Sequence, residues 1–123
     1  MAAYDHDNIF AKIIRGEILC NKVYEDGHVL AFHDINPQTP VHILVLPKGA
    51  YVSFDDFSEK ASAEEIAAFV RAAGQIARDN GLVAPGYRVL ANNGADANQE
   101  VPHLHLHIFA GKPLGRMIKP PEK

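Results

Sequence analysis

The stretch Val101–Phe109, VPHLHLHIF, has three histidines at every second position, each followed by an apolar residue. In a β-strand, successive side chains point to opposite faces, and alternate residues lie about 6.6 Å apart. One face of the predicted strand therefore carries imidazoles and the other carries Leu104, Leu106 and Ile108. The apolar face can pack on a core. The imidazole face needs hydrogen-bond partners or a function.

The spacing alone leaves three interpretations of the imidazole face open. Structural histidines on a half-exposed sheet are the usual explanation of a lone histidine, and we adopt it for His6, His28 and His33. Three imidazoles in strict alternation favour a site instead. They could bind zinc, for which neutral imidazole is a common ligand. Alternatively, a central imidazole could act as a nucleophile while its neighbours fix its tautomer and move protons.

The loop before the histidines, NNGADANQE, favours a phosphate as the group attacked. It holds a glycine, small residues and several side-chain amides. Such a loop can turn backbone N–H groups inward and bind an anion. Together with a histidine nucleophile, this composition indicates attack on phosphorus.

The rest of the chain predicts an α+β domain. We expect a short helix over 9–14 capped by Asn8, and a long helix over 62–80 that begins with a Ser62–Glu65 capping box. Strands are expected over 22–25, 29–34, 42–46, 87–92 and 103–109, and FDDFSEKAS (54–62) is expected to be a polar connector. An Asp-Gly turn joins the first two strands. Since short loops join most strands, we expect a mostly antiparallel sheet.

Composition excludes several other classes of protein. The 123 residues suit one domain, and a net charge of −3 with scattered basic residues does not fit a nucleic-acid binder. No stretch approaches the roughly 20 apolar residues of a membrane span. The single cysteine, Cys20, rules out an intramolecular disulfide, and the N-terminal residues are polar. We therefore expect a cytoplasmic protein without nucleic-acid or membrane partners.

The histidine stretch resembles the His-φ-His-φ-His-φ-φ signature of the histidine-triad (HIT) superfamily. IFAKIIRGEI, AFHDINPQTPVHILVLPK, GYRVLANNG and QEVPHLHLHIFAGKPLG resemble successive blocks of its HINT branch in the bacterial form. The resemblance implies one domain over 1–123, with a core over about 8–117 and a tail over 112–123. It implies a HIT-like fold, a five-stranded antiparallel sheet with two helices. A two-fold homodimer would form a ten-stranded sheet, for which 62–80 and 87–92 are the candidate interface elements.

The resemblance also implies an activity. HINT-branch enzymes are purine nucleoside phosphoramidases, which cleave P–N bonds in substrates such as adenosine 5′-phosphoramidate and AMP-lysine; some also hydrolyse aminoacyl-adenylates. By this resemblance His105 is the nucleophile and forms a covalent nucleotidyl-histidine, which water hydrolyses to a nucleoside monophosphate. His107 hydrogen-bonds the phosphate, His103 orients the nucleophile, and His42 is a fourth histidine facing the triad. No metal and no cofactor are required.

The implied substrate contacts fall into three groups. Asp34 accepts the two ribose hydroxyls, and Ile35 is the adjacent contact. An apolar slot for the purine base is formed by Ile9, Phe10, Ile13, Phe32 and Leu44. Asn92 contacts the phosphate or leaving group, and the phosphate loop contains Asn98, Gln99, Glu100 and Val101. Because the base contacts are apolar, we expect weak selection between adenine and guanine, with AMP or GMP as product.

Two departures and two alternatives accompany this resemblance. Glu100 stands where the eukaryotic branch has a serine, and the chain has no tryptophan to match the one in the eukaryotic tail. Histidine at position 107, where nucleotidyltransferases of the superfamily have glutamine, favours hydrolysis over transfer. The alternatives are a dinucleoside polyphosphate hydrolase of the Fhit-like branch and a zinc-binding or interaction protein without important turnover.

Overall fold

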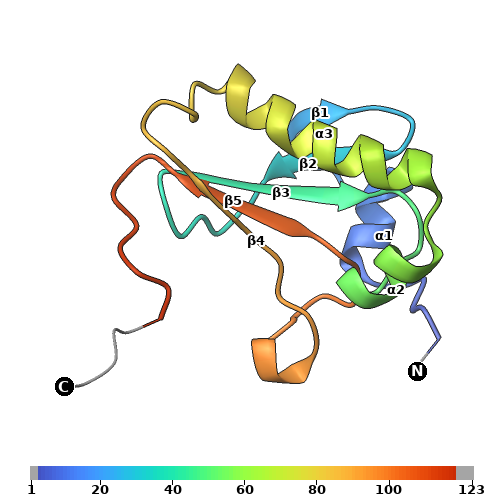
Figure 1. Ribbon diagram of the computed structural model, residues 1–123. Coiled ribbons are helices and arrows are strands. Elements are labelled where there is room, and N and C mark those ends of the chain that lie inside the picture. The colour runs from blue at the N-terminus through green and yellow to red at the C-terminus, as the bar shows by residue number, and fades with distance from the viewer. Residues whose placement is uncertain (1–2, 119–123) are drawn as a thin grey trace.

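The computed structural model describes residues 3–118, so 119–123 of the predicted tail lie outside the described residues. A single sheet in the order β1-β2-β3-β5-β4 forms its centre (Figure 1). The strands are β1 (Lys22–Glu25), β2 (Val29–His33), β3 (Val41–Pro47), β4 (Arg88–Leu90) and β5 (Leu106–Ala110). Every neighbouring pair is antiparallel, which confirms the predicted five-stranded antiparallel sheet.

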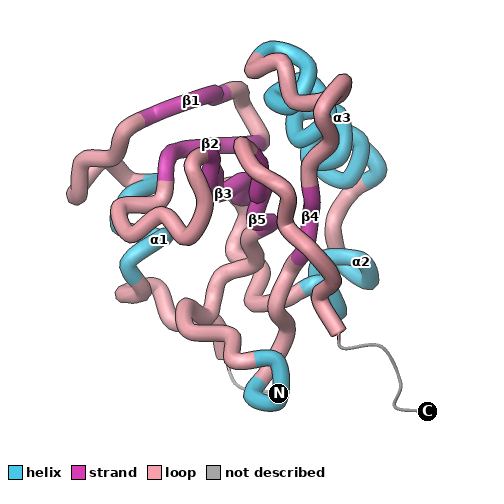
Figure 2. The backbone as a smooth tube through the Cα atoms, turned by 90° about the vertical axis from the view of Figure 1, so that its left-hand side faces the viewer, coloured by secondary structure: helices cyan, strands magenta, loops and turns pink. Residues whose placement is uncertain are grey.

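Helices α1 (Ile9–Ile14) and α3 (Ala63–Asp79) cover opposite faces of the sheet, as Figure 2 shows. The strand residues alternate accordingly. Val29, Ala31, Ile43 and Val45 share one buried cluster with α3 residues such as Phe69 and Ile76. Leu30, Phe32, Leu44 and Leu46 form a second cluster with Phe10 of α1. Among the described residues, no helix has the length and apolar composition of a membrane span.

The predicted capping box at the start of α3 is confirmed. Ser62 Oγ accepts a hydrogen bond from the Glu65 backbone N–H at 3.1 Å, and Glu65 Oε1 accepts one from the Ser62 N–H at 3.0 Å. Both bonds satisfy donors that the first helical turn leaves free. They fix where the long helix begins.

The prediction of a polar connector over FDDFSEKAS is wrong, because Phe54–Lys60 forms helix α2. Asp56 accepts hydrogen bonds from the backbone N–H groups of Val52 and Ser53, each at 2.7 Å. Phe57 is buried, with its ring 5.1 Å from the ring of Phe69 on α3. The sequence features that indicate this helix are the Ser53–Asp56 spacing and the apolar side chain at position 57.

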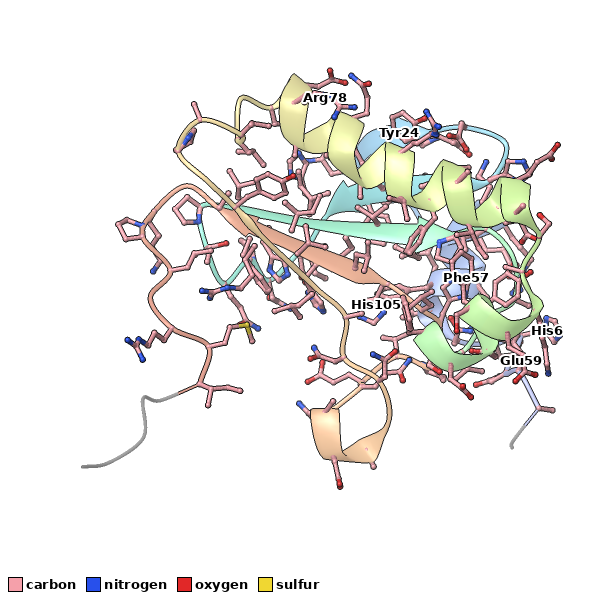
Figure 3. All side chains as sticks on the ribbon, in the orientation of Figure 1. His6, Tyr24, Phe57, Glu59, Arg78 and His105 are labelled. Carbon is pink, nitrogen blue, oxygen red and sulfur yellow. The ribbon has the colours of Figure 1, made fainter. Side chains whose placement is uncertain are left out.

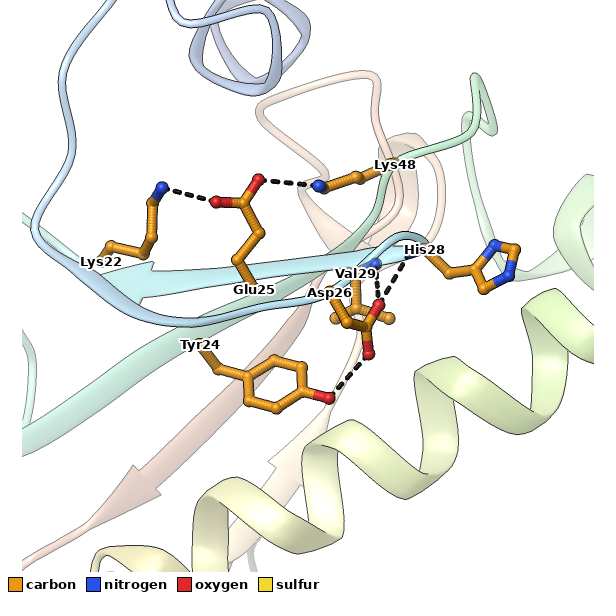
Figure 4. Close-up of polar contacts among 7 residues, drawn as sticks. All are labelled: Lys22, Tyr24, Glu25, Asp26, His28, Val29 and Lys48. Carbon is orange, nitrogen blue, oxygen red and sulfur yellow. Dashed lines mark hydrogen bonds and ion pairs between the residues drawn. The ribbon is translucent and has the colours of Figure 1, made fainter.

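The turn between β1 and β2 forms as the Asp-Gly pair predicts. Asp26 Oδ1 accepts hydrogen bonds from the N–H groups of His28 and Val29, at 2.7 and 2.9 Å (Figure 4). The Tyr24 hydroxyl donates to the other carboxylate oxygen of Asp26 at 2.6 Å. This turn joins β1, an edge strand, to β2, and two strands, β2 and β3, separate β1 from β5.

The largest boundary error concerns the histidines. The predicted strand over 103–109 begins only at Leu106, so His103 and His105 precede β5. The β3 partner of Leu106 is Val45, and two residues further along β3 lies Pro47, which has no N–H for a ladder. The strand predicted over 87–92 is also shorter, at Arg88–Leu90. β2 ends one residue earlier than predicted, and β3 is one residue longer than predicted at each end.

Candidate active site

A cavity of ≈ 160 Å³ opens between α1, the start of β5 and the loop that carries the 3₁₀ helix Ala95–Ala97. It brings together ten of the residues that the sequence predicts for the site: Phe10, Asp34, Leu44, Asn92, Asn98, Gln99, Glu100, Val101, His105 and His107. Gln38 also lines it and was not predicted. In Figure 3, His105 lies below the sheet, on the side of this loop.

Four predicted substrate contacts do not line the cavity. The Ile35 side chain is 87% exposed, and Ile9 on the outer side of α1 is 47% exposed. Phe32 is buried in the core, edge-on to Phe10 with ring centroids 5.8 Å apart, and Ile13 packs against the same cluster. The apolar surface open to the cavity is therefore supplied by Phe10, Leu44 and Val101.

The geometry around His105 leaves one ring nitrogen with an unshared lone pair. Its Nδ1 lies 2.7 Å from the backbone carbonyl oxygen of His103. A carbonyl can only accept, so Nδ1 carries the proton and Nε2 of the neutral ring holds a lone pair. Burial lowers the pKa of His105, although the bond to the His103 carbonyl opposes this effect. The edge-to-face contact with Phe10, at 4.8 Å between ring centroids, further restricts the orientation of the His105 ring.

His103 lies behind His105 rather than in the cavity, and its side chain is fully buried. Its Nε2 is 2.8 Å from the Pro47 carbonyl oxygen and its Nδ1 is 2.6 Å from the Tyr4 hydroxyl. Burial lowers the pKa of His103 to about 4, so the ring is neutral near pH 7. The sequence gives no signal for Tyr4, which is 99 positions away from its partner.

His42, predicted to face the triad, hydrogen-bonds His107. The Gln38 backbone N–H donates to His42 Nδ1 at 3.2 Å, so the proton of the neutral His42 ring is on Nε2. This Nε2 is 2.9 Å from His107 Nδ1 and 3.5 Å from Asp34 Oδ2. His107 therefore carries its own proton on Nε2. Burial, reinforced by His105 and His42, lowers the pKa of His107 to about 4.

The Gln99 side chain holds the loop in place. Its Nε2 donates to the carbonyl oxygens of Val52 at 2.6 Å and Val101 at 3.0 Å, and its Oε1 accepts from the Gly94 N–H at 2.9 Å. Asn98, before it, adopts a left-handed conformation with φ of 57°. Both amide protons of Gln99 are thus donated to other atoms of the protein. In the predicted phosphate loop, the Gln99 side chain therefore has a supporting role.

The predicted zinc alternative would need the triad imidazoles to converge on one ion. Both nitrogens of His103 bond to protein atoms, so the triad cannot provide three ligands to one ion in this geometry. One ligand atom from each of Asp34, His42 and His107 lies within 4.8 Å of the others. The facing nitrogens of these two histidines already share a hydrogen bond, which a cation would have to break.

Comparison with known proteins shows which proteins this chain is similar to. The chain is 64% identical over 115 residues to a 13.2 kDa HIT-like protein of Azospirillum brasilense, covering 94% of each chain. It is 39% identical to the purine nucleoside phosphoramidase of Escherichia coli K12 over 91% of this chain and 93% of that one. A HIT family hydrolase from Clostridium thermocellum superimposes with a TM-score of 0.85 at 36% identity, over 94% and 99% of the two chains. Residues 15–114 match the HIT domain. The chain therefore belongs to the HIT domain family.

Proposed function

We propose that this protein is a purine nucleoside phosphoramidase that hydrolyses the P–N bond of nucleoside 5′-phosphoramidates. The observation that carries the proposal is the tautomer of His105, whose Nδ1–H is held by the His103 carbonyl while Nε2 is left for attack. The similarity to a HIT family hydrolase supports hydrolysis, and the similarity to the E. coli phosphoramidase supports the P–N bond as its target.

The cavity offers a different surface to each part of such a substrate. Phe10 and Leu44 provide apolar contacts for the base, which select little between adenine and guanine. Asp34 offers Oδ2 to the ribose hydroxyls, since its Oδ1 already accepts the Asn36 N–H at 2.9 Å. The Nε2–H of His107 is a donor for a phosphate oxygen. Adenosine phosphoramidate and AMP-lysine are suitable substrates, and aminoacyl-adenylates present the same nucleotide.

The first step transfers the nucleotide to the enzyme. The lone pair on His105 Nε2 forms a bond to phosphorus as the P–N bond of the substrate breaks. The electron pair of that bond leaves with the amine nitrogen, which takes a proton from solvent water as it departs. The imidazole becomes cationic when it is bonded to phosphorus. The His103 carbonyl, hydrogen-bonded to Nδ1–H, stabilises that positive charge.

The second step releases the nucleotide. Water attacks phosphorus, the bond to His105 Nε2 breaks, and its electron pair returns to the ring as a lone pair. One proton of the water is lost to solvent, and the nucleoside monophosphate leaves. His107 donates to the phosphate in both steps without titrating, because its pKa of about 4 keeps the ring neutral near pH 7. The route needs no metal or other cofactor, and we place it in the cytoplasm, where the free Cys20 is compatible with a reducing environment.

We also propose a homodimer. β4 is a short edge strand, and Val89 on it is 44% exposed, beside the exposed Tyr87 and Val83. Val70 on α3 is 64% exposed. Exposed apolar side chains on a strand edge and a neighbouring helix are compatible with pairing to a second copy. Sedimentation at micromolar concentration tests this: a dimer mass is expected, and a monomer mass would contradict the proposal.

Rapidly quenched intact-mass spectrometry tests the proposed chemistry. Wild-type protein and His105→Ala are mixed with adenosine 5′-phosphoramidate. We expect a transient gain of one AMP on the wild type only, and hydrolysis by the wild type only. Faster turnover of a diadenosine polyphosphate than of the phosphoramidate would favour the dinucleotide hydrolase instead. No turnover of either substrate would leave the binding-protein alternative.

A further inference from the structure

We infer that Tyr4 is a positioning residue for the nucleophile and acts through His103. The inference rests on the proposed function for its catalytic consequence. The Tyr4 hydroxyl is 2.6 Å from His103 Nδ1, and the two rings meet edge to face at 5.7 Å between centroids. His103 in turn provides the carbonyl that holds the Nδ1–H of His105. Tyr4 is therefore two hydrogen bonds away from the ring that attacks phosphorus.

The donor and acceptor roles along this path are unambiguous. His103 Nε2 faces the Pro47 carbonyl, which can only accept, so Nε2 carries the single proton of the neutral ring. Nδ1 then has only a lone pair, and the Tyr4 hydroxyl must donate to it. Burial raises the pKa of Tyr4 above 10.0, so the hydroxyl keeps its proton throughout the physiological range. Without this donor, the fully buried Nδ1 would lose its hydrogen-bond partner.

The backbone of His103 depends on such bonds because it lies outside the sheet. β5 begins at Leu106, so no strand ladder holds residues 103–105. Two backbone bonds support the segment, from the His103 N–H to the Val101 carbonyl at 2.8 Å and from the Leu104 N–H to the Tyr51 carbonyl at 2.9 Å. The two ring bonds of His103 are the remaining polar restraints on this segment that involve a side chain, apart from the bond to His105 itself.

Tyr4 is itself held in place. The Asn8 side chain donates to the Asp5 carbonyl at 2.7 Å, and Arg15 Nη1 donates to the His6 carbonyl at 2.7 Å. These bonds join the segment before α1 to the helix. Because α1 also presents Phe10 to the His105 ring, the same N-terminal unit contacts the nucleophile directly and supports it from behind.

Tyr4 also borders two hollows. One, of ≈ 330 Å³, is bordered as well by Tyr51 and Asp56, and the other, of ≈ 170 Å³, by His6 and Arg15. Replacing Tyr4 with phenylalanine removes only the hydroxyl oxygen, so it tests the bond to His103 and keeps the aromatic ring.

The test compares Tyr4→Phe with Tyr24→Phe as the matched control. The Tyr24→Phe substitution also removes a hydrogen bond of 2.6 Å, from the Tyr24 hydroxyl to Asp26 (Figure 4). This bond lies on the edge strand β1, far from β5. Steady-state hydrolysis of adenosine 5′-phosphoramidate, thermal unfolding and ¹⁵N NMR of the imidazoles are measured for both variants and the wild type. We expect kcat of Tyr4→Phe to fall roughly tenfold with KM within about twofold, because the nucleophile rather than the substrate is displaced. The Nδ1 resonance of His103 moves in Tyr4→Phe only.

Each other outcome has a defined meaning. Equal kcat values for the two variants, or equal losses that follow a drop in unfolding temperature, would overturn the inference. An unchanged Nδ1 resonance in Tyr4→Phe would also overturn it, because the bond would then be absent in solution. If the wild type hydrolyses no phosphoramidate, the proposed function fails. The NMR comparison still separates that failure from the failure of the Tyr4–His103 coupling.

Discussion

His42 Nε2 and His107 Nδ1 lie 2.9 Å apart, and the direction of their hydrogen bond is fixed from outside the pair. The Gln38 backbone N–H occupies His42 Nδ1, so His42 donates and His107 accepts. His107 is thereby left with an Nε2–H donor beside His105. In the proposed function, a backbone amide on the loop before β3 thus determines which hydrogen of the site meets the phosphate.

The acidic limb of the rate profile should lie below the ordinary histidine range. His105 attacks only when Nε2 is unprotonated, and burial lowers its pKa from 6.5. His103, His107, Asp34 and Glu100 are the titratable groups around it, and the two carboxylates oppose the shift. We expect kcat/KM to reach half its plateau below pH 6.5. A midpoint at or above that value would contradict the proposed environment of the nucleophile.

Stability should fall as the solution becomes more acidic. The pKa values of His103 and His107 are about 4 in the folded protein, against 6.5 for an ordinary histidine. Between these values the unfolded chain binds more protons than the folded protein. For each of the two histidines, the free energy of unfolding therefore falls by up to about 1.4 kcal/mol with every unit by which the pH is lowered. Above 6.5 neither group contributes. Urea unfolding across this range should show the decline, and a flat profile would refute it. His103→Asn should make the slope shallower.

Asp34→Asn should reduce selection for ribose. The asparagine oxygen can still accept the Asn36 N–H, but the second carboxylate oxygen is replaced by an amide donor. We expect the wild type to prefer the ribonucleoside phosphoramidate over its 2′-deoxy analogue by roughly 10- to 100-fold, which corresponds to one charge-assisted hydrogen bond. The variant should show a ratio near one. An unchanged ratio of kcat/KM values would assign the hydroxyls to another residue.

Gln99→Ala should loosen the loop. It removes the donors to the Val52 and Val101 carbonyls and the acceptor for the Gly94 N–H. We expect a loss of about 1–3 kcal/mol in unfolding free energy and a KM roughly tenfold higher. Asp96→Asn, an exposed change in the same loop, is the matched control. If both variants behave alike, Gln99 does not support the loop.

Chelation should leave turnover unchanged, since each proposed step uses only protein nitrogen atoms and water. Excess zinc should inhibit, because Asp34, His42 and His107 can bind it only by breaking the His42–His107 bond. Activity assays with EDTA, and separately with added zinc, measure both effects. A loss of activity on chelation that zinc restores would require a metal in the mechanism.

Local sequence patterns predicted the elements that are determined by residues close together in the sequence. Alternating polarity placed Leu104 in the core and the imidazoles on the other side, and the Ser62–Glu65 pair located the start of α3. The start of β5 could not be predicted, because it depends on Pro47 of a neighbouring strand. Helix α2 was missed because its polar surface outweighed the single buried ring of Phe57.

The family resemblance predicted most of the residues that line the cavity. The contacts that hold these residues in place became known only from the structure. Gln38 acts through a backbone amide, which no side-chain motif records. Tyr4 contacts His103 across nearly the whole chain, and Gln99 bonds backward to Val52. Ile35 and Ile9 were assigned by position in a block, yet the described backbone turns both side chains towards solvent.

The triad is divided between β5 and the segment that precedes it. His107 is paired on both sides, with Leu44 of β3 and Leu90 of β4, whereas His105 stands before the ladder begins. In the proposed mechanism, His107 binds the phosphate and His105 bonds to phosphorus, which moves towards the attacking atom during displacement. An insertion or deletion in the loop before Val101 would shift the attacking nitrogen and leave the phosphate donor in place. In the proposed mechanism, the reactivity of His105 and the phosphate binding by His107 can therefore change independently.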